Sequence, residues 1–150
     1  MDALDSAIIG MLQSDGRQSN RDIAKALGVA PSTTLERVRA LRTRGVLTGV
    51  HATVDLAEIG RPVQGMVTVR LRPQSRQIVQ EFRDFVLKLP QTLQVFVTTG
   101  TEDLLVHVAV PSTEALRDFV LDSITKRREV AGVRTEVVFD HRRNHVLAPM

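Results

Sequence analysis

The sequence predicts an α+β protein in two parts, with three short helices followed by a four-stranded sheet and two further helices. Apolar residues recur at helical spacing up to about residue 45, whereas from residue 63 onward alternating apolar and polar residues predict strands between helical segments. The period changes near residues 58–62, so we expect one domain at residues 1–61 and another at 62–150. A chain of 150 residues with 43% hydrophobic composition can bury one core or two small ones.

The first two helices are predicted from apolar spacing and from residues typical of helix ends. Residues 2–14 place their apolar side chains on one stripe after an acidic first turn. Ser19 is a suitable N-cap for the second helix, and Asp22, three residues later, completes a near match to a capping box. Gly28 is then the expected end of this second helix.

A third helix is expected to begin at Pro31, where the missing N–H group has no cost, and to end at Gly45. Its expected inward stripe comprises Leu35, Val38 and Leu41. The tight turn between the second and third helices predicts a helix-turn-helix, in which the later helix lies in the major groove of DNA. Residues 45–55 predict a short β segment that would serve as a wing or connector.

The second part alternates between strand and helix periods. The expected elements are a strand at 63–71, a helix stopped by Pro90, strands at 93–99 and 104–110, a helix opened by Pro111 and Ser112, and a strand at 133–139. This βαββαβ order is that of a ferredoxin-like sandwich. The fold class predicted is therefore a winged helix-turn-helix followed by a ferredoxin-like domain.

The predicted sheet has one face without helices. The expected lining of that face is Met66, Thr68, Phe96, Thr98, Leu105, His107, Ala109 and Val138. Two helices can cover only one face of a four-stranded sheet, and this lining is too apolar to remain in water. A symmetric homodimer is the simplest way to cover it.

The positive charge of the chain is concentrated in one segment. Residues 17–44 contain seven basic and two acidic side chains, although the net charge of the whole chain is only +3. Such a patch is typical of proteins that bind a polyanion such as double-stranded DNA. The alternative is a solvated helix face with no partner.

Composition excludes several classes of protein. The chain has no Cys, Trp or Tyr, which excludes disulfides and thiolate metal sites and leaves few side chains that could stack on single-stranded nucleic acid. No apolar run is long enough to cross a membrane, and the N-terminal residues are acidic where a signal peptide is basic, so we expect a cytoplasmic location. His141 and His145 are four residues apart, but nothing predicts a helix to set their geometry, and we expect no metal. No catalytic motif has a recognisable spacing, so we do not expect an enzyme.

Candidate DNA contacts lie on and around the third helix. Its N-terminal half carries Ser32, Thr33, Glu36, Arg37 and Arg39 outside the apolar stripe. Arginine can bridge O6 and N7 of guanine, whereas hydroxyl and carboxylate groups can contact phosphates, bases or N4 of cytosine. The alternative for Arg37 is an ion pair with an acidic residue that merely organises the domain. The candidate phosphate contacts are Arg17, Arg21, Lys25, Arg42 and Arg44.

A candidate ligand site is the loop formed by Gly100, Thr101, Glu102 and Asp103. Backbone N–H groups after Gly100 could hold a carboxylate and Asp103 could hold an ammonium group, which are the two ends of a free amino acid. The alternative is a hairpin that needs glycine for its conformation and aspartate to bond its own turn, and the residues alone favour this alternative.

Four stretches together resemble the Lrp/AsnC (feast/famine) family of transcription regulators. They are LDSAIIGMLQSDGR at 4–17, RDIAKALGVAPSTTLERVRALRTRGVLTG at 21–49, VTTGTEDLLVHV at 97–108 and GVRTEVVF at 132–139. The resemblance implies a DNA-binding regulator that forms dimers and often octamers through its C-terminal domain. It also implies that an amino-acid effector, and no other cofactor, binds between dimers near Gly100 and Asp103. Two positions differ from the family pattern: Ala30 replaces the usual serine N-cap, and Leu104 replaces a frequent aromatic residue.

Two other classes of function remain open from the sequence. One is an architectural protein that compacts DNA with little sequence preference. The other is an enzyme on a dimeric ferredoxin-like sheet, with His107 or an acid of the loop as its reactive group.

Overall fold

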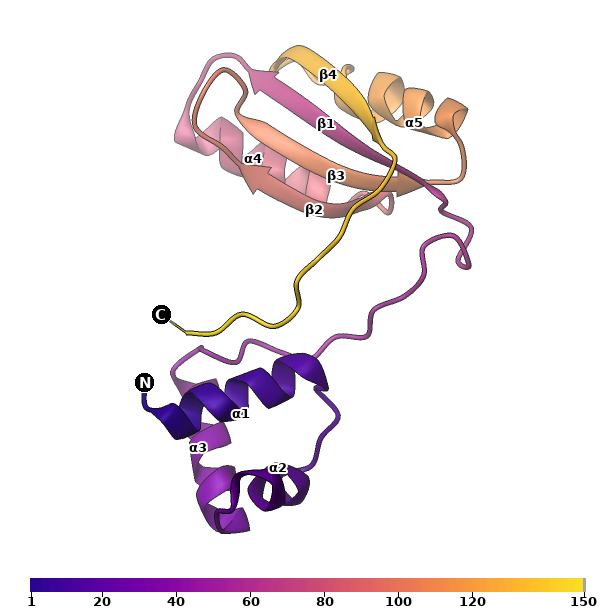
Figure 1. Cartoon of the computed structure of the whole chain (residues 1–150). Helices are drawn as coiled ribbons and strands as arrows, with labels where there is room; N and C mark the ends of the chain where they lie inside the picture. Colours follow the sequence, from indigo (N-terminus) through magenta and orange to yellow (C-terminus); the bar gives the residue numbers. More distant parts are fainter. Residues whose placement is uncertain (150) are drawn as a thin grey trace. The chain divides into compact units, whose positions relative to one another are not determined.

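The computed structural model describes residues 1–149 of the chain, which forms two compact units (Figure 1). Residues 1–52, with the tail that begins at Arg142, form the helical unit, and residues 53–141 form the sheet unit. These units differ from the predicted ranges 1–61 and 62–150 in two segments. Residues 53–61 group with the sheet, and the C-terminal tail groups with the helices. In the described part of the chain, no helix is long and apolar enough to cross a bilayer.

The helical unit consists of three helices around a small apolar core. These are α1 (Ala3–Ser14), α2 (Asn20–Leu27) and α3 (Pro31–Thr43). The buried core side chains are Ile8, Ile9, Ile23, Val38 and Leu41. All three predicted helices are therefore confirmed, and each contributes to the same core.

The ends of α2 follow the sequence-based expectation. The N–H of Asp22 donates to Ser19 Oγ at 3.2 Å, and the N–H of Ser19 donates back to Asp22 Oδ2 at 3.3 Å, which is a complete capping box. Gly28 ends the helix with a φ of 68°, a left-handed conformation that glycine adopts without steric cost. The reversal at Gly28 directs the chain into the turn that leads to α3.

The buried side of helix α3 differs slightly from the predicted one. Its fully buried side chains are Thr34, Val38 and Leu41, whereas Leu35 is only half-buried. Residues 34, 38 and 41 recur at i, i+4 and i+7, so the expected stripe was wrong by one position at its start. The hydroxyl of Thr34 has no hydrogen-bond partner among the described residues.

The β segment expected at residues 45–55 is wrong. The N–H groups of Val46 and Leu47 both donate to the carbonyl oxygen of Leu41, at 2.9 and 3.2 Å, and form a turn that closes α3. Residues 48–55 have no regular structure. A strand needs a partner for its hydrogen bonds, and the four described strands all pair with one another in the sheet unit. The helix-turn-helix is thus present without a wing strand in the described residues.

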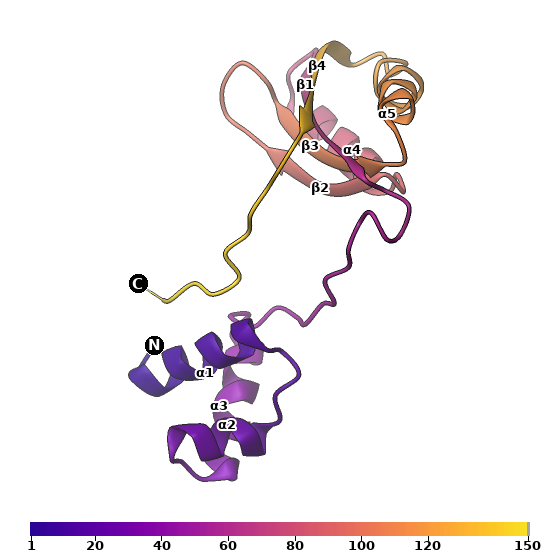
Figure 2. The same cartoon turned by 45° about the vertical axis from the view of Figure 1, so that its right-hand side comes forward.

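The sheet unit has the predicted βαββαβ order. Its elements are β1 (Val63–Leu71), α4 (Arg76–Leu87), β2 (Thr92–Val97), β3 (Leu104–Val110), α5 (Thr113–Phe119), which continues as a π-helical segment η1 (Val120–Ile124), and β4 (Val130–Val138). The strand order is β2-β3-β1-β4, and every neighbouring pair is antiparallel. Helices α4 and α5 lie on the same face of the sheet, as Figures 1 and 2 show.

The main core of the sheet unit lies between the sheet and these two helices. Val67, Val69 and Leu71 alternate along β1 toward the helices and are fully buried, with Phe82 of α4 in the same cluster. A Cβ atom on Gly65 would lie 2.9 Å from Leu116 Cδ1. Glycine at this position therefore allows α5 to pack closely against β1.

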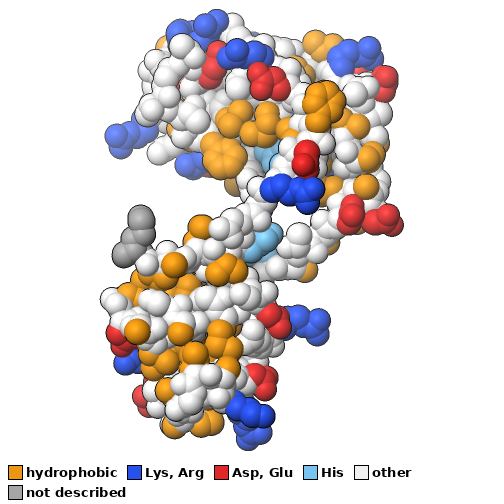
Figure 3. Space-filling view, viewed as in Figure 1, with side chains coloured by type: hydrophobic (Ala, Val, Ile, Leu, Met, Phe, Trp, Pro, Cys, Tyr) orange, Lys and Arg blue, Asp and Glu red, His pale blue; other side chains and the backbone are white. Residues whose placement is uncertain are grey.

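The opposite face of the sheet, the open face, carries apolar side chains that are only partly buried. Figure 3 shows hydrophobic side chains gathered over the strands on this face. Met66, Leu105 and His107 are half-buried, and Phe96 is 45% exposed. Ala109 follows Leu105 and His107 on the same side of β3, as expected, but it is fully buried, and its N–H group donates to the carbonyl of Gln91 in the segment before β2.

Candidate nucleic-acid interface and ligand loop

Helix α3 has one face that is free of the core. Successive residues of an α-helix are about 100° apart, so the side opposite Val38 and Leu41 is fixed by the periodicity. The residues on that side are Ser32, Glu36, Arg39 and Thr43, and all four are exposed. We call these four residues the exposed stripe. Thr43 was missed by the sequence analysis, although its spacing of four from Arg39 was a signal that could have found it.

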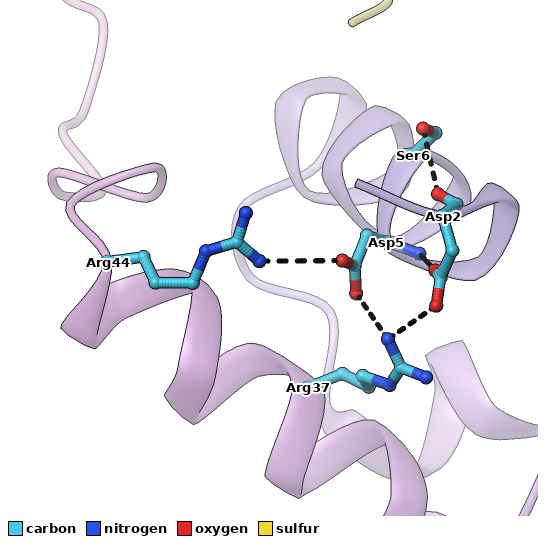
Figure 4. A network of polar contacts seen from close by, with 5 residues as sticks. All are labelled: Asp2, Asp5, Ser6, Arg37 and Arg44. Atoms are coloured by element: carbon cyan, nitrogen blue, oxygen red, sulfur yellow. Dashed lines mark hydrogen bonds and ion pairs between the residues drawn. The ribbon is translucent and has the colours of Figure 1, made fainter.

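Two other arginines of α3 bind carboxylates of α1. Arg37 Nη1 lies 2.6 Å from Asp2 Oδ2 and 3.2 Å from Asp5 Oδ1 (Figure 4). Arg44 Nη1 lies 3.7 Å from Asp5 Oδ2, and the Asp5 side chain is only 6% exposed. A nearly buried carboxylate needs a cation or hydrogen-bond donors to offset its lost hydration. Both side chains therefore join α3 to α1, which is the alternative stated for Arg37, and their contacts with DNA stay predictions.

The electrostatics of this network agree with its geometry. The pKa of Asp2 is lowered from its ordinary value, chiefly by the hydrogen bond from the N–H of Asp5 and further by Arg37. The pKa of Arg37 is raised, mainly by its hydrogen bond to Asp2. Asp2 also serves as the N-cap of α1, because it accepts that Asp5 N–H at 2.8 Å. The Asp2 side chain thus caps the N-terminus of α1 and also binds Arg37 of α3.

The remaining predicted DNA contacts on the helical unit are accessible. Among these predicted residues, Arg17, Arg21, Lys25, Arg39 and Arg42 are exposed and form no ion pair within the described part of the chain. Thr33 is half-buried at the start of α3, beside the exposed Ser32. These cations are available to an external anion, in contrast to Arg37 and Arg44.

The loop between β2 and β3 is anchored by Asp103. The Asp103 side chain accepts hydrogen bonds from the Leu71 N–H at 2.7 Å and from the Gln74 amide, and its own N–H donates to the Val69 carbonyl at 2.9 Å. The residue is 5% exposed. Both carboxylate oxygens are therefore engaged within the unit. The Asp103 carboxylate is thus bonded to the end of β1 and to the segment before α4 rather than to its own turn, and its contact with a ligand ammonium stays a prediction.

The rest of this loop faces outward. Gly100 has a φ of 133°, which other residues rarely adopt. The Thr98 hydroxyl donates to the Glu102 carbonyl at 2.9 Å, which narrows the loop. Thr101 is exposed, and the carboxylate of Glu102 lies 3.9 Å from Arg134 Nη2 of β4. Of the four predicted ligand residues, Gly100, Thr101 and Glu102 thus remain accessible.

His107 is placed on the open face. Its Nε2 atom lies 2.9 Å from Gln64 Oε1, and its ring contacts that of His141 edge to face, with centroids 5.9 Å apart. Burial lowers the pKa of His107, and the charge of His141 lowers it further. Among the described residues, no three His, Cys, Asp or Glu side chains are arranged to hold a metal ion.

Comparison with known proteins agrees with this geometry. The family model for the AsnC-type helix-turn-helix domain matches residues 1–42, and the model for the Lrp/AsnC ligand binding domain matches residues 64–146. The chain belongs to the Lrp/AsnC family. The predicted family and fold class are thereby confirmed.

Relatives of this Lrp/AsnC protein are named as transcriptional regulators. It is 34% identical to the HTH-type transcriptional regulator AldR of Mycobacterium tuberculosis over 143 residues, which are 95% of this chain and 80% of the relative. It is 28% identical to the transcriptional regulator AzlB of Bacillus subtilis, over 100% of this chain and 96% of the relative. This Lrp/AsnC protein is accordingly a transcriptional regulator, and the expectation that it is not an enzyme is confirmed by its family.

Solved structures share the whole fold. The crystal structure of M. tuberculosis AldR matches with a TM-score of 0.75 and 31% identity, over 99% of this chain and 100% of that one. A transcriptional regulator from Neisseria meningitidis in complex with L-Met matches with a TM-score of 0.88 and 24% identity, over 100% of this chain and 96% of that one. These similarities extend across both units.

Proposed function

We propose that this Lrp/AsnC regulator recognises operator DNA with α3, and that an amino acid bound by the sheet unit changes its affinity for that DNA. The observation that carries the proposal is the distribution of cations on the helical unit. Arg37 and Arg44 are bound to α1, whereas Arg39 and four other basic residues are exposed and not in ion pairs within the described residues. A helix-turn-helix with exposed cations around its second helix fits the major groove and the flanking phosphates.

The proposed contacts divide into two groups. Glu36 and Arg39 contact base edges, Ser32 and Thr33 contact base edges or the nearest phosphates, and Arg17, Arg21, Lys25 and Arg42 contact phosphates. Phosphate contacts give affinity and register, and base contacts give sequence preference. Arg37 and Arg44 act indirectly, by fixing α3 against α1.

The proposed assembly is a homodimer through the open face, with further association to an octamer. Half-buried Met66 and Leu105 and the exposed ring of Phe96 supply an apolar surface that a second copy would cover. A twofold assembly would present two copies of α3 to successive major grooves roughly 34 Å apart. The expected operator is therefore quasi-palindromic, and the expected site of action is the cytoplasm.

The proposed effector is a free amino acid bound near Gly100, Thr101 and Glu102, between dimers. The family's ligand binding domain covers this loop, and the neighbour from N. meningitidis was solved with L-Met. Because Asp103 is already satisfied within the unit, Glu102 is the carboxylate that we assign to the ligand ammonium. A ligand can change DNA affinity only by binding two assemblies or conformations unequally.

Selection of bound fragments from a random DNA pool tests the DNA-binding part of this proposal. We expect an enriched, quasi-palindromic sequence. Retention of all sequences alike, with a steep dependence on salt, would instead favour an architectural protein. Titration of each free amino acid against the selected operator, with oligomer mass measured in parallel, tests the effector. No change in affinity or mass with any of them would remove amino-acid sensing from the proposal.

A further inference from the structure

We infer that Glu36 and Arg39 determine the sequence preference of this protein, by contacting two consecutive G·C base pairs in each half-site, and that Arg37 is a positioning residue that does not contact bases. The inference rests on the proposed function, since it assumes that α3 enters the major groove. It goes further because it assigns the base pairs that are contacted and excludes Arg37, on the same helix, from base contact.

The first step is the position of Glu36 and Arg39 on α3. Both belong to the exposed stripe, on the side of the helix opposite the buried Val38 and Leu41. They are three residues apart, which separates their Cα atoms by about 4.5 Å along the helix axis. The rise of one base pair in DNA is about 3.4 Å. Two side chains at this spacing on one helix face can therefore contact neighbouring base pairs.

The second step is the availability of these two charges. Neither side chain takes part in an ion pair within the described residues, although a separation of three would permit a weak pair on the helix surface. Arg37 and Arg44 differ in this respect, because they are bound to Asp2 and Asp5. Within the described residues, Glu36 and Arg39 therefore have no ion pair that must break before they can contact DNA.

The third step is the chemistry of the base edges. A carboxylate close to DNA is repelled by phosphates, so it needs a hydrogen-bond donor without an adjacent acceptor. Cytosine presents only the N4 amino group in the major groove, whereas adenine presents the N7 acceptor beside its N6 amino group. Glu36 is thus best matched to cytosine. The guanidinium of Arg39 is matched to guanine, whose O6 and N7 accept two parallel hydrogen bonds.

The fourth step excludes Arg37. Its Nη1 atom is within 3.2 Å of carboxylate oxygens of both Asp2 and Asp5. Contact of this Nη1 atom with a base would require it to leave both partners, and Asp5 would then retain only the longer contact with Arg44. The guanidinium of Arg37 therefore fixes the angle between α3 and α1. It influences DNA binding only through that angle.

The test is the same fragment selection, carried out with the full-length wild type and with single variants. For the wild type, we expect two consecutive G·C pairs in each half-site. Glutamine binds adenine through N6 and N7, so Glu36→Gln should replace one of these pairs by A·T. Arg39→Ala should lose the preference at the neighbouring position and bind the wild-type operator roughly tenfold to hundredfold more weakly.

Two control variants separate base contacts from other effects. Arg21→Ala removes a proposed phosphate contact and should weaken all sequences alike while retaining the selected sequence. Arg37→Gln should also retain the selected sequence, whatever its affinity. If Arg37→Gln does not fold by circular dichroism, Arg37→Lys keeps a cation beside Asp2 and Asp5 without the forked donor geometry and serves in its place.

The outcomes distinguish the inference from the proposed function. If the wild type selects an operator but Glu36→Gln and Arg39→Ala select the same one, the inference is wrong and DNA binding stands. A changed selection with the Arg37 variant also overturns it. If the wild type selects no sequence, the proposed sequence-specific function fails, and the inference fails with it.

Discussion

Arg37 of α3 lies 2.6 Å from Asp2, the residue that caps the N-terminus of α1. The two residues are 35 positions apart in the chain, and the same guanidinium also contacts the nearly buried Asp5. This pair ties the first turn of the helical unit to the helix that we propose to enter DNA. The orientation of α3 therefore depends on carboxylates at the very start of the described chain.

Replacing Asp5 by asparagine should destabilise the helical unit. The substitution removes the charge that Arg37 and Arg44 share, and we expect a loss of about 1 kcal/mol because both arginines are partly exposed. Hydrogen exchange of the α1 amides in the full chain measures the change. Glu36→Gln is the matched control, since it removes an exposed carboxylate from the same unit. Equal exchange rates in the two variants would contradict the role given to Asp5.

A serine in place of Ala30 should stabilise α3. Ala30 is the N-cap of this helix and gives it no side-chain hydrogen bond. The hydroxyl of a serine could accept an N–H group of the first turn, so Ala30→Ser should raise the stability of the helical unit by about 1 kcal/mol. Thermal unfolding of the full chain, followed by the signals of this unit, gives the comparison. Ala30→Val, which adds no acceptor and is as poor an N-cap as alanine, is the control, and a serine variant no more stable than this valine variant would count against the prediction.

A valine in place of Thr34 should also be stabilising. The Thr34 side chain is fully buried and its hydroxyl has no partner among the described residues. Valine has nearly the same shape without the hydroxyl, so Thr34→Val should gain about 1 kcal/mol. Thr43→Val makes the same change at an exposed site of α3 and should have little effect. Chemical denaturation of both variants decides the matter, and a loss of stability in Thr34→Val would show that the hydroxyl is bonded.

The stability of the sheet unit should fall at mildly acidic pH because of His107. Burial lowers the pKa of His107 below its ordinary value of 6.5, so the unfolded chain binds a proton more readily than the folded one. The contribution of His107 is therefore intact well above pH 6.5 and is lost as the pH falls from there toward the lowered pKa. Chemical denaturation as a function of pH measures this slope. His107→Gln should flatten it, and an unchanged slope in that variant would assign the effect to other groups.

The sequence predicted those features that depend on local patterns. The capping box of Ser19 and Asp22, the stop at Gly28 and the alternation along β1 are all set by residues a few positions apart, and each was confirmed. Periodicity was less exact for α3, because positions three and four residues before Val38 both fit a helical stripe, and only the packing shows that Thr34 rather than Leu35 is fully buried. The β segment at 45–55 failed because strand formation needs a partner, and composition alone cannot show that a partner is missing.

The roles of charged residues were harder to predict, because their partners lie far away in the sequence. Arg37 was placed correctly on α3, but its partners are 35 and 32 positions earlier. Asp103 was placed correctly in the loop, but it bonds to Leu71 and Gln74, about 30 residues before it. An ion pair was the stated alternative for Arg37, but the partners of both residues could be identified only from the three-dimensional contacts.

The anchoring of Asp103 has a consequence for how any ligand of its loop would act. Because this carboxylate holds the Leu71 N–H at the end of β1 and the Gln74 amide just before α4, the loop cannot shift without pulling on both. A ligand bound at the tip of the loop would therefore strain β1, a central strand of the sheet. It would not simply move a flexible loop.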